Sequence, residues 1–259
     1  WGFSNDELQF YEEEPGQGLT DDDDIPEVEE AITKSGDIWL LGEHRVLCGD
    51  ATKKEDVALL MEGQKADMVI TDPPYGIGFE YNSHIDQKGE PYEQFCDDWF
   101  NNLISIENKV IFTGWSYNRF WFNKEPYDVF YWIVKGKHSG GKNSHFRKTE
   151  PVLMWGRIKE QFDFDYIIQD SIKKIHGVVE EHSCPKPVDL FHSFISNYTK
   201  NGDSVLDVFL GSGTTLIACE KTNRKCYGME IDPHYCDVIV KRWEEFTGNK
   251  AERVERAEC

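Results

Sequence analysis

Residues 203–222 read DSVLDVFLGSGTTLIACEKT and predict a strand, a glycine-rich turn and a helix in immediate succession. The first part is short and apolar, as in a strand that is buried on both faces of a sheet. Gly211 and Gly213 permit a tight turn and a close backbone approach to a nucleotide-like ligand, with ordinary turn glycines as the alternative. The loop lacks the lysine of a P-loop and the full GxGxxG spacing, which argues against ATP, GTP and dinucleotides.

Strands and helices alternate through the rest of the chain, which predicts an α/β domain with a mostly parallel, twisted sheet. The apolar segments 127–136 and 149–156 flank a polar loop and predict an antiparallel hairpin at one edge. Asp232 and Pro233 predict the start of the last helix, and Gly248 predicts its end. The other predicted strands are 36–50, which turns at Gly42 and Glu43, 66–72, 109–115 and 225–232, and the other helices are 53–63, 91–107 and 185–199.

Polar residues follow four of the predicted strands, namely Asp50, Asp72, the loop 209–214 and Glu230. In open α/β sheets, ligands bind outside the carboxyl ends of the strands, so these residues form a candidate site. Glu230 is placed to accept hydrogen bonds from two ribose hydroxyls, as acids do in nucleotide-binding folds. A helix-capping acid beside Asp232 is the alternative interpretation of this residue.

The segment TDPPYG, residues 71–76, ends one of these strands with an unusual corner. Pro73 and Pro74 cannot continue a strand because each lacks an N–H and has its φ angle fixed. We expect a stiff corner that presents the Asp72 carboxylate, backbone carbonyls and the Tyr75 ring. A proline-rich turn with an incidental aspartate is the alternative.

The net charge of −20 is distributed unevenly along the 259 residues. Residues 1–30 hold twelve acidic residues and no Lys or Arg, so the rest of the chain carries a net charge of −8. Such an acidic block is typical of a solvated, poorly ordered tail or linker. Residues 129–149, in contrast, contain basic residues and no acid, which predicts a basic loop.

Composition narrows the class of protein further. The chain has neither an apolar run of eighteen residues nor a signal peptide, which predicts a soluble, cytoplasmic protein. The seven cysteines are scattered without a CxxC pair, which favours reduced thiols over disulfides or a zinc site. The histidines show no ligand spacing, so no metal site is predicted.

In combination, these motifs resemble those of the amino-methylating DNA methyltransferases that use S-adenosylmethionine. DVFLGSGTT, residues 207–215, is similar to their cofactor motif, and TDPPYG is similar to their catalytic motif. The catalytic motif comes first, and HSCPKPVDLF, residues 182–191, stands just before the cofactor motif. This order resembles the circularly permuted β class, which includes many N6-adenine enzymes. The resemblance covers roughly residues 36–248 and implies a Rossmann-like methyltransferase fold.

The resemblance also implies a domain organisation. We expect residues 1–35 to be an acidic tail or linker, 36–248 the methyltransferase domain, and 249–259 a C-terminal tail, with a short target-recognition region at about 136–182. The start and end of the chain look like the methyltransferase half of proteins that carry a ParB-like domain upstream, and a chain that begins with Trp1 fits a fragment. Its substrate partner would be double-stranded DNA. A second copy of the chain or a separate subunit would be a protein partner, and no interaction with a membrane is expected.

The resemblance implies a mechanism for the proline corner. Asp72 and the carbonyl of Pro73 would accept the two hydrogens of the adenine N6 amine and aim its lone pair at the methyl group. Pro74 would stiffen the corner, and Tyr75 would stack on the extruded base. The methyl group would come from S-adenosylmethionine, which leaves as S-adenosylhomocysteine, and no metal is required.

The implied cofactor-binding residues come from several parts of the chain. Asp50 would touch the adenine of the cofactor, with a turn-capping aspartate as the alternative, and Phe209 would pack near it unless it is a core residue. Lys186 would lie near the carboxylate of the cofactor, although the family usually reads HPTQKPV where this chain has HSCPKPV. The remaining residues are Asp207, which would brace the loop, Gly211, Ser212, Gly213, Thr214 and Glu230.

DNA phosphates would meet the basic loop through Lys137, Lys142, Arg147 and Lys148, with a solvated loop as the alternative. Two other functions stay open. An N4-cytosine methyltransferase would use the same chemistry, but such enzymes more often carry Ser at the position of Asp72. A catalytically idle DNA-binding regulatory module is disfavoured because the catalytic and glycine motifs are both intact.

Overall fold

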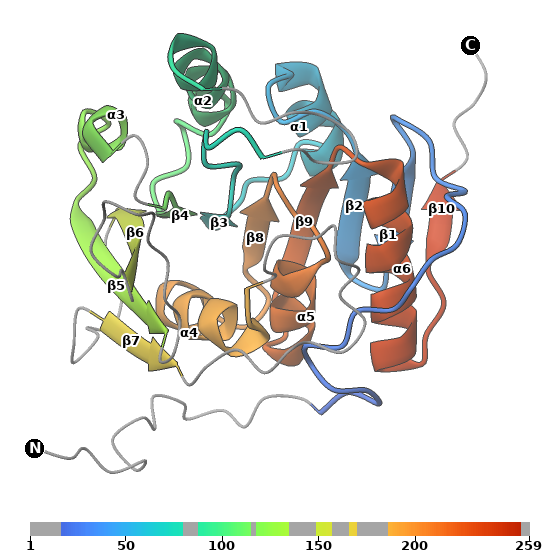
Figure 1. The fold of residues 1–259 in the computed structure, drawn as a ribbon. Helices are drawn as coiled ribbons and strands as arrows, with labels where there is room; N and C mark the ends of the chain where they lie inside the picture. The colour runs from blue at the N-terminus through green and yellow to red at the C-terminus, as the bar shows by residue number, and fades with distance from the viewer. Residues whose placement is uncertain are drawn as a thin grey trace, which may run out of the picture.

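The computed structural model describes residues 17–79, 88–114, 118–134, 149–156, 166–169 and 186–254. Within these ranges the strands form one sheet in the order β10-β1-β2-β9-β8-β3-β4-β6-β5-β7 (Figure 1). The strands are β1 (Ile38–Leu41), β2 (His44–Cys48), β3 (Met68–Thr71), β4 (Lys109–Phe112), β5 (Asp128–Val134), β6 (Thr149–Trp155), β7 (Tyr166–Gln169), β8 (Ser204–Asp207), β9 (Lys225–Glu230) and β10 (Glu252–Val254). The helices are α1 (Lys54–Met61), α2 (Glu90–Asn102), α3 (Asn118–Phe122), α4 (Val188–Tyr198), α5 (Thr214–Lys221) and α6 (Pro233–Thr247).

The centre of the sheet is parallel, and antiparallel strand pairs occur on both sides of it. Strands β2, β9, β8, β3 and β4 run parallel to one another, as the alternation of strands and helices predicts. The predicted antiparallel hairpin is confirmed as β5 and β6, but β7 adds a further strand parallel to β5. On the other side, β1 pairs antiparallel with β2 and β10. The sheet therefore has more antiparallel strand pairs than predicted. Strands β1 and β2 pair antiparallel because the turn that joins them is too short for the crossover that a parallel pair needs.

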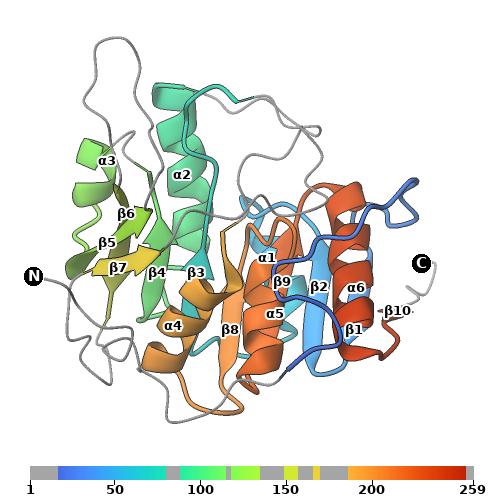
Figure 2. The ribbon, with the colours of Figure 1, turned by 60° about the horizontal axis from the view of Figure 1, so that its bottom comes forward.

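Two hydrophobic cores lie on opposite faces of the sheet. Helices α4, α5 and α6 cover one face, in front of the strands in Figure 2, with Phe194, Leu216 and Trp243 in their core. Helices α1, α2 and α3 belong to the second core, which includes Leu60 and Trp99. No helix in the described ranges is long and apolar enough to cross a membrane.

Local sequence explains where helix α6 begins and ends. The side chain of Asp232 accepts a hydrogen bond of 2.9 Å from the backbone N–H of His234, and Pro233 occupies the first turn. Gly248 ends the helix in the left-handed conformation, and its N–H donates to the carbonyl of Glu244. The prediction for this helix is confirmed at both ends.

The cysteines in the described part of the chain are buried and carry no disulfide. Buried thiols behave as small apolar side chains, and three of these belong to the cores, Cys219 and Cys226 to one and Cys96 to the other. The described cysteines are Cys48, Cys96, Cys219, Cys226 and Cys236.

The ends of the domain differ from the prediction. From residue 17 onward the predicted poorly ordered tail lies against α6, where the N–H of Leu19 donates to the carbonyl of Phe246. Residues 252–254 of the predicted C-terminal tail form β10. This edge strand is short and charged, so it has no apolar pattern by which it could be predicted from the sequence. The predicted recognition region supplies the sheet strands β6 and β7, and the rest of it lies outside the described residues.

Candidate active site

Strands β8 and β3 lie side by side at the point where the chain reverses its direction of progress across the sheet. From β8 the chain passes through α5 to β9, and from β3 it passes through α2 to β4 on the opposite side. Such a switch point leaves a crevice at the carboxyl ends of the two strands, where ligands bind in open α/β sheets. Asp207 ends β8 and Thr71 ends β3, so the glycine loop (residues 209–214) and the proline corner (residues 71–76) both start here.

Asp207 connects these two motifs. Its carboxylate accepts hydrogen bonds from the hydroxyl of Thr71, at 2.6 Å, from the hydroxyl of Thr215 and from the N–H of Phe209, at 3.0 Å. The side chain is buried, and this burial raises the pKa of Asp207 to about 6, although the three hydrogen bonds oppose the shift. The residue therefore ties the end of β3, the glycine loop and the first turn of α5 into one unit.

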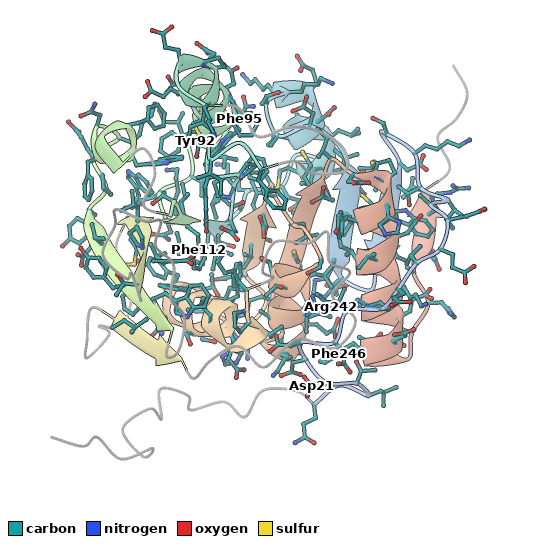
Figure 3. The ribbon with its side chains drawn as sticks, viewed as in Figure 1. Asp21, Tyr92, Phe95, Phe112, Arg242 and Phe246 are labelled. Carbon is teal, nitrogen blue, oxygen red and sulfur yellow. The ribbon has the colours of Figure 1, made fainter. Side chains whose placement is uncertain are left out.

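The proline corner holds the Asp72 carboxylate between two donors. The hydroxyl of Tyr75 donates to Oδ1 at 2.6 Å, and the ammonium of Lys186 donates to Oδ2 at 2.6 Å. The hydroxyl of Tyr92, from α2, donates to the carbonyl of Pro74 at 2.8 Å. Figure 3 shows Tyr92 and Phe95 below α2, on the side that faces the sheet. The corner is thus fixed by hydrogen bonds as well as by its two prolines.

Lys186 links the corner to the glycine loop. Its side chain is buried, with Nζ 3.1 Å from the Tyr75 hydroxyl and 5.3 to 5.8 Å from the ring centroids of Tyr75, Phe112 and Trp132. Aromatic faces attract a cation in this range. The backbone carbonyl of Lys186 accepts a hydrogen bond of 3.2 Å from the hydroxyl of Thr214. This lysine contacts the proline corner directly, a contact that the sequence pattern did not predict.

The glycine loop leaves room for a ligand. Gly211 has a φ angle of 55°, and a Cβ atom added to it would meet nothing within 4 Å. Gly213 has a φ angle of 90° and is the N-cap residue of α5, where a Cβ would lie 3.3 Å from Ile239. Both residues therefore use backbone conformations that other residues rarely adopt. Ser212, between them, is buried, and its carbonyl accepts a hydrogen bond of 2.9 Å from Arg242.

Glu230 stands at the end of β9 beside this loop. Its Oε2 accepts a hydrogen bond of 2.8 Å from the N–H of Gly211, and its Oε1 accepts one of 2.9 Å from the N–H of Asp232. Burial raises the pKa of Glu230 to about 7. The bond to Asp232 fits the alternative, helix-capping interpretation, while the bond to Gly211 places the carboxylate at the rim of the loop.

Comparisons with known proteins identify the family of this chain. The DNA methylase family N6_N4_Mtase matches residues 66–241, which include both the proline corner and the glycine loop. The chain belongs to this DNA methylase family. It is 24% identical over 242 residues to the type II methyltransferase M.HpaI of Haemophilus parainfluenzae, a match that covers 80% of this chain and 76% of M.HpaI. It is 25% identical to M2.DpnII of Streptococcus pneumoniae, over 71% of this chain and 84% of M2.DpnII.

Two solved structures share the fold. The M1.HpyAVI–SAM complex aligns with a TM-score of 0.54 and 24% identity, over 76% of this chain and 98% of that one. The PvuII DNA methyltransferase, which is cytosine-N4-specific, aligns with a TM-score of 0.58 and 19% identity, over 76% and 85% of the two chains. At these identities the likeness establishes the fold alone.

Two other predicted residues of this methylase have local partners. Oδ1 of Asp50 accepts hydrogen bonds from the N–H of Thr52, at 3.0 Å, and from its hydroxyl, at 2.7 Å, which is the geometry of the alternative turn-capping role. Asp50 nevertheless lies at the predicted rim, because the N–H of Gly49 donates to the carbonyl of Glu230. Phe209 packs on Phe95 and Trp99, with ring centroids 5.8 and 5.3 Å away, as its alternative core role requires.

Sequence reasoning missed several residues that hold the site of this methylase. Thr71 and Thr215 belong to the motifs TDPPYG and DVFLGSGTT, so a search for hydroxyl side chains near Asp72 and Asp207 in the sequence would have found them. Tyr92 and Arg242 lie within amphipathic helices and carry no local signal. The candidate DNA-binding residues Lys137, Lys142, Arg147 and Lys148 all lie outside the described residues.

Proposed function

We propose that this protein transfers a methyl group from S-adenosylmethionine to the N6 amine of adenine in double-stranded DNA, as a permuted, β-class member of its family. The observation that carries this proposal is the hydrogen bond between Thr71 and Asp207. It joins the strand that presents the proline corner to the strand that presents the glycine loop. A reacting amine and a cofactor would therefore meet at one switch point of the sheet.

The residues at the rim fit S-adenosylmethionine. The open space above Gly211 admits a ligand close to the backbone, and the Glu230 carboxylate beside it can accept hydrogen bonds from ribose hydroxyls. Asp50, beside Glu230, is the candidate contact for the adenine ring. Asp207 stays behind the loop and holds its shape. When bound, the cofactor supplies an electrophilic methyl group on a sulfonium.

The proline corner would prepare the amine. The lone pair of an exocyclic amine is delocalised into the base, so two rigid acceptors are needed to localise it and aim it. Asp72 and the carbonyl of Pro73 are these acceptors, and Tyr92 holds the adjoining peptide through the Pro74 carbonyl. Preorganised acceptors of this kind contribute several kcal/mol each. The Tyr75 ring is the candidate platform on which the extruded base stacks.

Radioactive methyl transfer to unmethylated bacterial DNA, followed by mass spectrometry of the nucleosides, tests the proposal. N6-methyladenine is the expected product. N4-methylcytosine would keep the mechanism and overturn the choice of base. Binding of S-adenosylmethionine to a protein that binds DNA but makes no product would favour a regulatory module instead.

The pH dependence of cofactor binding tests the role of Glu230. The pKa of this residue is about 7 in the unliganded protein, and ribose hydroxyls donate best to its ionised form. Affinity for S-adenosylmethionine should therefore rise by about tenfold between about pH 6 and about pH 8. In the absence of cofactor, the free energy of unfolding should fall as the pH rises from the ordinary glutamate pKa of 4.5 towards 7. Over this range Glu230 ionises in the unfolded chain but stays protonated in the folded protein.

Calorimetric titration at both pH values measures the first effect. Glu230→Gln should show no such rise, because its amide does not ionise in this range. A wild-type affinity that stays constant or falls with pH would remove Glu230 from the ribose site.

A double charge reversal tests the basic loop. Lys142→Glu with Lys148→Glu should weaken binding to a DNA duplex and reduce the slope of log affinity against log salt by about one for each phosphate that is no longer neutralised. The matched control is Lys65→Glu with Lys200→Glu, two exposed lysines that precede β3 and β8, away from the carboxyl rim. Equal DNA affinity in the two double variants would contradict the proposed phosphate contacts.

A further inference from the structure

The acidic strap, defined as residues 18–33, crosses the outer face of α5 and α6 (Figures 1 and 2). At its start, the N–H of Leu19 donates to the carbonyl of Phe246 at 2.8 Å. At its end, the backbone and hydroxyl of Thr33 donate to the Asp237 carboxylate of α6. The strap is therefore attached at both ends, and its aspartates 21–24 lie between these attachments.

Arg242 of α6 connects the strap to the glycine loop. Its guanidinium donates through Nη1 to the carbonyl of Ser212 at 2.9 Å and through Nη2 to the carbonyl of Asp22 at 2.7 Å. The side chain is only 3% exposed, and burial lowers its pKa to about 10, while the neighbouring aspartates of the strap oppose that shift. Figure 3 shows Arg242 and Phe246 of α6 near Asp21 of the strap. A buried guanidinium needs such acceptors, because an unpaired buried charge is strongly unfavourable.

Two aspartates attach the strap to neighbouring helices. The carboxylate of Asp22 forms an ion pair with Lys221, at the end of α5, whose side chain is 7% exposed. The carboxylate of Asp23 accepts a hydrogen bond of 2.9 Å from the N–H of Val188, the first residue of α4. Val188 stands two residues after Lys186, so Asp23 also fixes the segment that delivers this lysine to Asp72.

We propose that Asp22 and Asp23 are positioning residues for the cofactor site. Asp22 holds the strap so that Arg242 keeps Ser212, and with it the glycine loop, in place. Asp23 holds the start of α4, and with it Lys186. This inference rests on the proposed function for its consequence, namely cofactor binding, but the restraint on the loop belongs to the unliganded protein.

The double variant Asp22→Asn with Asp23→Ala tests this role, since Asn removes the charge that pairs with Lys221 and Ala removes the acceptor of the Val188 N–H. We expect binding of S-adenosylmethionine, measured by calorimetry, to weaken by about tenfold. Hydrogen exchange of the unliganded protein should become faster in the glycine loop, residues 209–214. The matched control is Glu29→Gln with Glu30→Gln, which removes the same charge from two exposed residues of the strap.

The outcomes separate this inference from the proposed function. If the wild type does not bind the cofactor, the proposed function fails, and hydrogen exchange in the loop still decides the restraint. If the Asp variant and the Glu control exchange and bind alike, the positioning role is overturned. If the Asp variant fails to fold, Arg242→Lys is tested in its place. The lysine ammonium keeps the positive charge but not the bridge between the carbonyls of Ser212 and Asp22. Unchanged exchange of the loop in Arg242→Lys would likewise overturn the proposal.

Discussion

Replacement of Asp72 by Asn is expected to lower kcat for methyl transfer by about a thousandfold and to leave affinity for S-adenosylmethionine nearly unchanged. The carboxylate has two acceptor oxygens, which receive the Tyr75 hydroxyl and the Lys186 ammonium in the unliganded protein. Asn retains one acceptor and replaces the other with a donor, so it cannot meet both groups and also accept an amine hydrogen. The loss should fall on catalysis because Asp72 belongs to the corner and not to the glycine loop.

Single-turnover transfer of labelled methyl to DNA measures this effect separately from product release. Asp98→Asn is the matched control, since it makes the same chemical change at an exposed position of α2. Wild-type turnover in the Asp72 variant would show that the proline corner has a structural role only. Weak cofactor binding in the same variant would instead assign Asp72 to the cofactor site.

Replacement of Lys186 by Met is expected to have the second largest effect, a fall in kcat of about a hundredfold. Met has a similar length and suits the neighbouring rings of Tyr75, Phe112 and Trp132, but it removes the ammonium that donates to Asp72. If Lys186 acts through Asp72, as the contact of 2.6 Å indicates, kcat falls and the KM for S-adenosylmethionine stays constant. If it binds the carboxylate of the cofactor, as the resemblance implies, this KM rises.

Steady-state kinetics with varied cofactor distinguish the two roles of Lys186. Lys109→Met is the matched control, because Lys109 is also buried but lies at the start of β4, away from the rim. Its ammonium donates to the backbone carbonyl of Ile106 and not to a carboxylate. Lys186→Arg should recover part of kcat if charge beside Asp72 is what matters. Unchanged kinetics in Lys186→Met would leave this residue with neither role.

Much of the fold could be predicted because its signals are local. Asp232, Pro233 and Gly248 mark the ends of α6 through their own backbone preferences, and the structure confirms them. The proline corner ends β3 for a similar reason, since proline cannot pair within a sheet. Short, charged β10 has no such signal and depends on an open edge of β1 with which to pair.

The sequence by itself determined which residues stand at strand ends, because backbone conformation depends on neighbours within a few residues. Tertiary structure alone decided which of these ends meet. The Thr71–Asp207 contact spans 136 positions and the Lys186–Asp72 contact spans 114 positions. Such pairs form only once the order of strands is fixed and burial makes an unpaired carboxylate or ammonium unfavourable. For the same reason, the sequence of the acidic strap predicts a solvated tail, whereas in the fold the strap binds to the buried Arg242 through the carbonyl of Asp22.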